Sequence, residues 1–255
     1  SNSEAALSAD GHSVAFTSGA TNLLAGGSGY QDIYIKDLAT GSLTRVSTTS
    51  AGAAGNAGSS AAALSEDARV VAFQSFASNL VAGDTNAAVD IFVKDVSTGA
   101  LTRVSANYSG VEANADSYHA ALNADGTRVA FESYATNLVV NDTNATIDVF
   151  VNDLSTEQLI RVSTTASGGQ ANNSSGQASL SGDGRYVAFH SDASNLVAGD
   201  TNDTRDVFVK DLQTGAIQLV STGASGNLGN SASYNARISA DGRYVVFQSF
   251  ADNLV

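Results

Sequence analysis

The sequence contains no cysteine, proline, methionine or tryptophan. The lack of cysteine excludes a disulfide framework and thiol-based catalysis. Basic residues are scarce, because 12 Lys and Arg stand against 25 Asp and Glu and leave a formal net charge of −13. A chain with this charge is repelled by nucleic acids and anionic lipids, whereas its acidic surface suits divalent cations. We therefore expect no nucleic-acid partner.

Long apolar stretches are absent as well. No run approaches the roughly 18 apolar residues of a membrane-spanning helix, so we expect no membrane span. No signal peptide precedes Ser1 and the chain has no initiator methionine. We interpret it as a processed or excised piece of a longer product.

What the chain does contain is one sequence unit that recurs five times. Each copy starts with Leu or Ile, passes through a polar turn with an invariant Asp, and enters an apolar segment that ends in Phe. The spacing between these phenylalanines is 57 residues once and 58 residues three times, at Phe16, Phe73, Phe131, Phe189 and Phe247. A fixed period of this length indicates an array of one supersecondary unit.

The second copy shows the content of the unit. Its patterning predicts short strands at 62–65, 70–75, 90–95 and 101–105, followed by a long polar linker at 106–120. The strand at 70–75 carries apolar residues on both faces, so we expect it to lie between two neighbouring sheets. Radial repetition of small four-stranded antiparallel sheets is a β-propeller, and we predict this all-β fold.

We expect a single propeller over residues 1–255, with four full repeats and a half repeat, so that about five blade positions are visible. The approximate repeats are 4–60, 61–117, 118–175, 176–233 and a partial 234–255. The last copy stops at Val255, where its remaining two strands should begin. Natural proteins usually cover an open sheet edge. We expect either that the native polypeptide continues past Val255, and before Ser1, or that another chain completes the blade.

The recurring words resemble the TolB-like, WD40-like (PD40) propeller repeat of bacterial periplasmic and secreted proteins. In chain order they are L-S-x-D-G, V-A-F-x-S, N-L-V, D-T-N, D-x-F-V-x-D and R-V-S, and they cover nearly the whole sequence. Family members commonly have Pro at the third position of the first word, where this chain has Ala9, Glu66, Ala124, Gly182 and Ala240. The resemblance implies a bladed propeller from a secreted, cell-surface or periplasmic bacterial protein. It implies no single activity.

One constellation suits a metal. A loop of the form D-x-N-x-x-x-D precedes the third strand in three copies, and its candidate ligands are Asp84, Asn86, Asp90, Asp142, Asn144, Asp148, Asp200, Asn202 and Asp206. Ca²⁺ takes about six to eight oxygen ligands in irregular geometry, so each of the three loops is a candidate Ca²⁺ site. The alternative is a metal-free Asx turn. The first copy keeps only Asp32, which indicates that the second Asp has a structural task without metal.

Other polar residues give weaker signals. We interpret His12, His119 and His190 as scattered surface residues, because they stand at unrelated repeat positions. The recurring arginines are expected to face solvent or pair with an Asp, and the fourth copy has Leu219 in their place; they are Arg45, Arg103 and Arg161. Asn56, Ser59 and their counterparts are interpreted as strand caps and ties between blades, with a ligand-facing role as the alternative.

The aromatic residues of the loops do not indicate a repeated sugar site. The tyrosines of the loops and linkers could stack on sugars, and they are Tyr30, Tyr108, Tyr118, Tyr134 and Tyr234. These five residues do not share one repeat position.

We predict a non-catalytic extracellular or cell-surface propeller that acts as a structural or protein-interaction module and is stabilised by Ca²⁺. The alternatives are a carbohydrate-binding propeller and a propeller appendage of a secreted hydrolase or lyase. The expected partners are a protein or a glycan at the cell surface, and the incomplete last blade would also allow self-association.

Overall fold

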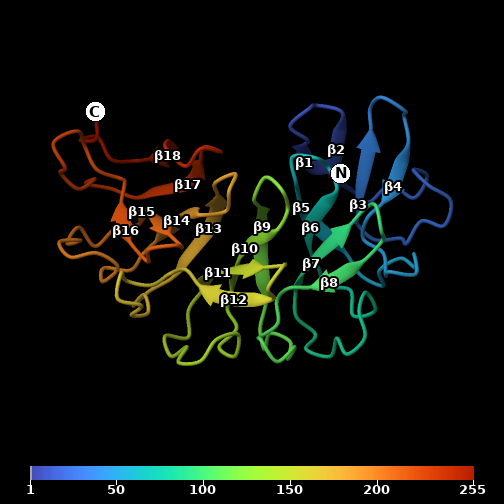
Figure 1. Cartoon of the computed structure of the whole chain (residues 1–255), viewed down its shortest axis with the longest axis horizontal. Coiled ribbons are helices and arrows are strands. Elements are labelled where there is room, and N and C mark those ends of the chain that lie inside the picture. The colour runs from blue at the N-terminus through green and yellow to red at the C-terminus, as the bar shows by residue number, and fades with distance from the viewer. Residues whose placement is uncertain (1) are drawn as a thin grey trace.

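The computed structural model describes residues 2–255, and every regular element in this part of the chain is a β-strand (Figure 1). No helix that could span a membrane occurs among the described residues. Four sheets contain four strands and a fifth contains two. This arrangement confirms the predicted all-β class with four full units and a half unit.

Each sheet is one blade, and its strands follow one another in chain order with antiparallel pairing. Blade 1 contains β1 (Asn2–Leu7), β2 (Ser13–Ser18), β3 (Asp32–Asp37) and β4 (Leu43–Arg45). Blade 2 contains β5 (Ser59–Leu64), β6 (Val70–Ser75), β7 (Asp90–Asp95) and β8 (Leu101–Arg103). Blade 3 contains β9 (Ser117–Leu122), β10 (Arg128–Ser133), β11 (Asp148–Asp153) and β12 (Gln158–Arg161). Blade 4 contains β13 (Ser175–Leu180), β14 (Tyr186–Ser191), β15 (Asp206–Asp211) and β16 (Ile217–Leu219), and blade 5 contains β17 (Ser233–Ile238) and β18 (Val245–Ser249).

The blades follow an arc around a common axis, and blades 1 and 5 lie on either side of an opening at the top of the view (Figure 1). The first strand of each blade is the innermost, because β1, β5, β9, β13 and β17 contact one another in turn. Their residues surround a hollow of about 520 Å³. Most of its lining side chains are alanine, so the inner strands can approach the axis closely.

The innermost strands begin earlier than their sequence suggests. β5 starts at Ser59 rather than at the predicted residue 62, and the predicted linker 106–120 is wrong in its last four residues, which belong to β9. Ser59 and Ser60 pair with β6, but the register then shifts at a β-bulge. Ala61 in this bulge has φ 53°. The first residues of this strand are small and not β-branched. Such residues have little strand propensity, so the sequence did not indicate where the strand begins.

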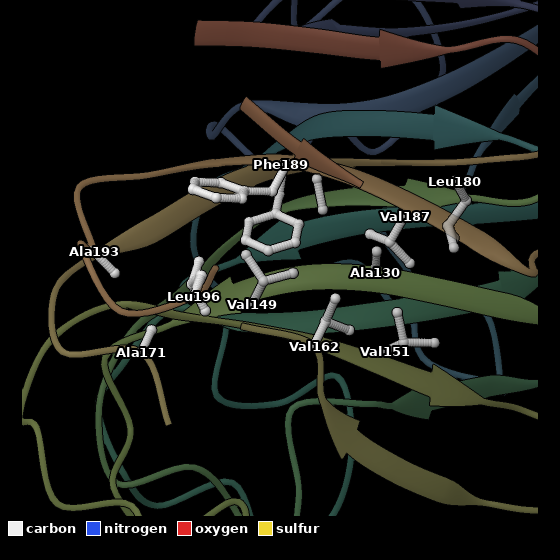
Figure 2. Packing of buried hydrophobic residues seen from close by; sticks show 12 residues of the cluster. Ala130, Val149, Val151, Val162, Ala171, Leu180, Val187, Phe189, Ala193 and Leu196 are labelled. Atoms are coloured by element: carbon white, nitrogen blue, oxygen red, sulfur yellow. The ribbon is translucent and has the colours of Figure 1, made fainter. Parts of the chain in front are cut away.

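The core lies between successive blades. In Figure 2, Val187 and Phe189 of β14 lie against Ala130, Val149 and Val151 of blade 3. The two faces of a second strand enter two separate clusters, as predicted. Val71 and Phe73 join the cluster with blade 1, and Ala72 joins the cluster with blade 3. Each buried Phe contributes about 1.5–3 kcal/mol through removal of apolar surface from water.

Backbone hydrogen bonds also connect the blades. The N–H of Ala9 donates to the carbonyl of Glu66, and Glu66 donates in the same way to Ala124. The series continues from Ala124 to Gly182 and from Gly182 to Ala240 over distances of 2.8–3.1 Å. A proline has no N–H to donate. The absence of proline from the L-S-x-D-G word therefore leaves a donor that each blade uses to hold the next.

Candidate functional site

The two ends of the blades differ in the length of their connections. One end carries the loops that follow the second strands, such as 76–89, 134–147 and 192–205, together with the blade-to-blade linkers 104–116, 162–174 and 220–232. We call it the long-loop face. The other end, the short-turn face, carries the turns 65–69, 96–100 and their counterparts. All nine predicted metal ligands lie on the long-loop face.

The linkers on this face are tied to the loops beside them. The N–H of Asn56 donates to Oδ1 of Asn79, and Oδ1 of Asn56 accepts from the N–H of Ser78. The same arrangement recurs at Asn114, Asn172 and Asn230. The structural interpretation of these asparagines is confirmed, but each ties a linker to a loop of the blade that the linker enters rather than one blade to the next.

The last Asp of each loop is buried at the start of the third strand. The hydroxyl of Ser105 donates to Oδ1 of Asp90 over 2.5 Å, and the same Ser–Asp pair recurs as Ser163–Asp148 and Ser221–Asp206. In blade 1 the hydroxyl of Ser47 donates to Asp32. The structural task that the sequence indicated for this Asp is thereby confirmed. Burial raises the pKa of Asp90, Asp148 and Asp206.

The Asn of each loop has both ends of its amide engaged. Oδ1 of Asn86 accepts from the N–H of Ala88, while Nδ2 donates to the carbonyl of Ala113 and to Asp90. Asn144 and Asn202 make the corresponding bonds to the chain. Their oxygens therefore point at backbone N–H groups. Ligation of Ca²⁺ by these asparagines stays a prediction, and their hydrogen bonds favour the Asx-turn alternative.

A guanidinium lies between the two carboxylates of blades 2 and 3. Nη1 of Arg103 is 3.6 Å from both Asp84 and Asp90. Nη1 of Arg161 is 3.4 Å from Asp142 and 3.5 Å from Asp148. Both arginine side chains are only 9% exposed, so the predicted pairing with Asp is confirmed and the solvent-facing alternative is wrong.

Blade 4 has the same carboxylates without the arginine, because Leu219 occupies its repeat position. Burial and the nearby charges of Asp206 and Asp203 raise the pKa of Asp200 to about 6. Asp200 is 8% exposed, and the described residues offer it no hydrogen bond and no ion pair. It is the one predicted ligand position at which a buried carboxylate within residues 2–255 lacks a partner.

A second polar cluster lies at the inner strands and was missed by the sequence analysis. Nδ1 of His119 is 2.6 Å from Oε1 of Glu132, and Oε2 of Glu132 accepts from the N–H of Gln177 in the next blade. Burial opposes the charge of Glu132, but the bonds from His119 and Gln177 lower its pKa overall. Burial, followed by the charge of Arg205, lowers the pKa of His190 to about 4.

The surface interpretation is wrong for His190, which is partly buried, whereas His119 lies at the surface as predicted, with its side chain 53% exposed, and pairs with Glu132. His119 is at the bulge of β9, with φ 54°, and Glu132 and His190 share the fifth position of β10 and β14. The signal was present in the repeat, because this position is polar in an otherwise apolar strand, as Gln74, Glu132, His190 and Gln248. In blades 2 and 3 its side chain accepts from the bulge N–H of the next blade, so the cluster connects blades.

Exposed aromatic residues gather on the long-loop face. Phe76, Tyr134 and Phe250 follow directly after a second strand and share one repeat position, with exposed fractions of 61%, 48% and 72%. Tyr118 and Tyr234 also share a repeat position, although the five loop tyrosines together do not, as expected. The rings of Tyr234 and Phe250 are 5.6 Å apart.

Comparison with known proteins places the fold. No protein-family model matches the chain, and no curated protein matches it in sequence. Among solved structures it is similar to TolB from Acinetobacter baumannii, with a TM-score of 0.54, 19% identity, and coverage of 98% of this chain and 54% of that one. It is also similar to a TolB candidate from Agrobacterium tumefaciens, with a TM-score of 0.55, 16% identity, and coverage of 96% and 73%.

These neighbours confirm the resemblance of the repeat words at the level of fold. The chain has a TolB-like propeller architecture, and it spans about half the length of the Acinetobacter protein, of which it covers 54%. Such low identity establishes the architecture and leaves the activity to be argued from the site.

Proposed function

We propose that this chain is a non-catalytic propeller of a secreted or cell-surface protein, and that it binds a protein partner through the long-loop face. The supporting observation is the set of exposed aromatic residues at one repeat position, Phe76, Tyr134 and Phe250. Aromatic side chains supply large contact areas at little entropic cost, and they dominate the energetics of protein interfaces.

The backbone presents these rings in a fixed manner. The N–H of Phe76 donates to the carbonyl of Gly58 over 3.0 Å, and Tyr134 and Phe250 make the same bond to Asp116 and Ala232. The preceding serines, such as Ser75 and Ser133, are buried at the strand end. Binding therefore costs little backbone ordering, which favours a preformed interaction surface.

The net charge of the chain supports a protein partner over a nucleic acid. The chain carries a formal charge of −13. Basic or apolar surfaces of a partner would complement it, whereas phosphate groups would be repelled.

The non-catalytic part of the proposal is supported by the use of the polar residues. The Ser–Asp pair at the start of the third strand recurs in every full blade and is hydrogen-bonded within the chain. The cluster around Glu132 joins the backbones of two blades. These groups stabilise the propeller, and an active site needs groups that are free to exchange protons or bonds with a substrate.

The test compares two variants of the chain. Phe76, Tyr134 and Phe250 are replaced by Ala together, and Leu38→Ala with Tyr244→Ala provides the control on the short-turn face, where both residues are exposed. Partners captured from envelope and secreted proteins of the source organism are purified, and their Kd is measured. We expect the triple variant to raise Kd at least about 30-fold, or about 2 kcal/mol, and the control to change it little.

Three outcomes would contradict the proposal. The first is a partner that binds the triple variant as tightly as the wild type. The second is a glycan-array signal that the triple variant loses, which would identify the face as a lectin site. The third is recovery of the native protein in the cytosol on fractionation. Mass measurement of the free chain in solution separates partner binding from self-association at the edge of β18.

A further inference from the structure

The arginine of blades 2 and 3 is surrounded by oxygen atoms. In blade 2 they belong to Asp84, to Asp90, to Glu112, whose Oε2 accepts from Nη1 of Arg103 over 2.9 Å, and to the carbonyl of Gly83, which accepts from Nη2 over 3.4 Å. In blade 3 Arg161 lies beside Asp142 and Asp148, and the carbonyl of Asn141 accepts from its Nη2. Two carboxylates and one main-chain carbonyl, which both blades share, thus form a cation pocket that an arginine of the same blade fills.

Blade 4 retains the oxygens of this pocket. Gly199, Asp200 and Asp206 stand 58 residues after their counterparts in blade 3. Leu219 replaces the arginine, and Leu228 replaces Gln170, which donates to both carboxylates of blade 3 over 2.8 and 3.1 Å. Blade 4 has therefore lost the two donors that reach both carboxylates in blade 3, Arg161 and Gln170, whereas the linker residue Ser221 still donates to Asp206.

The remaining carboxylate pair is buried without a counter-charge. Asp206 is fully buried and Asp200 is 8% exposed. Asp206 receives hydrogen bonds from Ser221 and Asn202, whereas Asp200 has no partner among residues 2–255. Two ionised carboxylates in such a place are costly unless a cation or a proton neutralises them.

Asp200 also borders open space. A hollow of about 280 Å³ is lined by Asp200, Asp203, Thr204, Asn172 and Ser194, among others. The hydroxyl of Thr204 is buried and has no hydrogen-bond partner among the described residues. The same is true of the hydroxyl of Thr146 in blade 3. The hollow gives water a route to the carboxylates, and water can fill ligand positions that the chain leaves open.

We propose that blade 4 binds one Ca²⁺ ion between Asp200 and Asp206, where the neighbouring blades place a guanidinium. Carboxylate, carbonyl and water oxygens are the ligands that Ca²⁺ prefers, and it accepts irregular geometry. The described residues contain no group of three His, Asp or Glu side chains arranged for a metal. In the proposed site the carbonyl of Gly199, the counterpart of the carbonyls that accept from Arg103 and Arg161, completes the shell together with water molecules.

The consequence is local order on the long-loop face. The ion would join the loop 192–205 to the start of β15, as Arg161 joins the corresponding parts of blade 3. Ca²⁺ would then raise the stability of the native chain, because a ligand that binds only the folded state shifts unfolding by mass action.

The test uses the purified chain in chelator and in Ca²⁺. Binding is measured by calorimetry and by terbium luminescence, and Tm is measured in both conditions. We expect one bound ion and a Tm higher by several degrees in Ca²⁺. Asp200→Asn should weaken binding at least about 100-fold, since it removes a charged ligand. Glu157→Gln removes an exposed charge from the surface of blade 3 and should bind Ca²⁺ like the wild type.

Leu219→Arg provides the sharper variant, because it restores the residue of the other blades. We expect it to abolish Ca²⁺ binding and to raise Tm in chelator. Asp200→Asn should also raise Tm in chelator, since it relieves the repulsion from Asp206, so loss of binding in either variant is distinguished from failure to fold. Absence of binding to the wild type at millimolar Ca²⁺, or unchanged binding by Leu219→Arg, overturns the proposal.

Discussion

Blades 3 and 4 bury the same pair of carboxylates at the start of their third strands, but only blade 3 buries a guanidinium with them. Arg161 lies 3.4–3.5 Å from Asp142 and Asp148, and Leu219 stands in its place beside Asp200 and Asp206. The hydroxyl of Ser163 donates to Asp148 and that of Ser221 donates to Asp206, so the Ser–Asp bond persists in both blades. The fold therefore depends on the Ser–Asp pair, while the source of the positive charge is free to vary.

The two blades also differ at the fifth position of their second strands and at the loop residue that follows these strands. Glu132 of blade 3 is replaced by His190, and Tyr134 is replaced by Asp192. Residues that are the same in every repeat stabilise the fold that the blades share. Residues that differ between repeats can give a single blade its own property. Each of the three replacements can be tested by exchange between blades.

The largest effect is expected from Arg161→Leu, which gives blade 3 the residue of blade 4. Removal of one partner leaves Asp142 and Asp148 buried without their counter-charge. Loss of one side of a buried ion pair costs about 3–5 kcal/mol. Urea unfolding at pH 7 should show this loss in the free energy of unfolding, with an unchanged m-value.

A control and a metal titration sharpen the result. Arg69→Leu breaks an ion pair with Asp95 whose arginine is 57% exposed, and its midpoint should stay close to the wild type. If blade 4 holds Ca²⁺, Arg161→Leu should regain part of its stability in Ca²⁺. A loss below about 1 kcal/mol would show that the guanidinium does not balance the carboxylates of blade 3.

The second effect is a pH dependence that belongs to blade 4. The pKa of His190 is lowered from 6.5 to about 4 by burial and by Arg205, while Glu132 and Asp192 oppose this and His119 adds to it. The unfolded chain therefore binds the proton more tightly. Stability is fully present above pH 6.5 and is lost as the pH falls towards 4. The expected loss between pH 7 and pH 5 is about 2 kcal/mol.

The matched variant is His190→Gln, because blades 2 and 5 have Gln74 and Gln248 at this position. It should have a stability close to the wild type at pH 7 and a smaller decline towards pH 5. Guanidinium unfolding at both pH values measures the difference. If the free energy of unfolding falls equally in the wild type and in His190→Gln, groups other than His190 take up the proton.

The sequence alone predicted the part of this comparison that depends on order along the chain. The period located the blades, and the first repeat, which keeps Asp32 without the other loop residues, indicated the structural task of the last Asp. The pairing of Arg103 with Asp was expected from charge. The sequence did not predict that the guanidinium would lie between two carboxylates. The fourth strand, which carries the arginine, and the loop before the third strand meet only in the folded sheet.

Contacts between blades were the part that the sequence could not provide. Glu132 bonds the N–H of Gln177, 45 positions further along the chain, and the bulge that exposes this N–H lies in a strand of small residues without propensity. The pairing of His119 was missed because it depends on strand pairing within blade 3. His119 stands at the bulge of β9 and Glu132 at the fifth position of β10, so their side chains meet only when these two strands pair.

The smallest effect is expected on the long-loop face of blade 4. Arg205 and Asp192 form two hydrogen bonds of 2.8 and 2.9 Å, with side chains 40% and 31% exposed, where blade 3 has Ile147 and Tyr134. Solvent screens such a pair, so a double-mutant cycle with Arg205→Ala and Asp192→Ala should give a coupling of about 0.2–1 kcal/mol that shrinks in 1 M salt. A coupling above about 2 kcal/mol would mean that the pair is desolvated in solution. The exposed pair of Arg205 and Asp192 would then matter as much for stability as the buried Arg161 of blade 3. The difference between buried and exposed charges in these two blades would not hold.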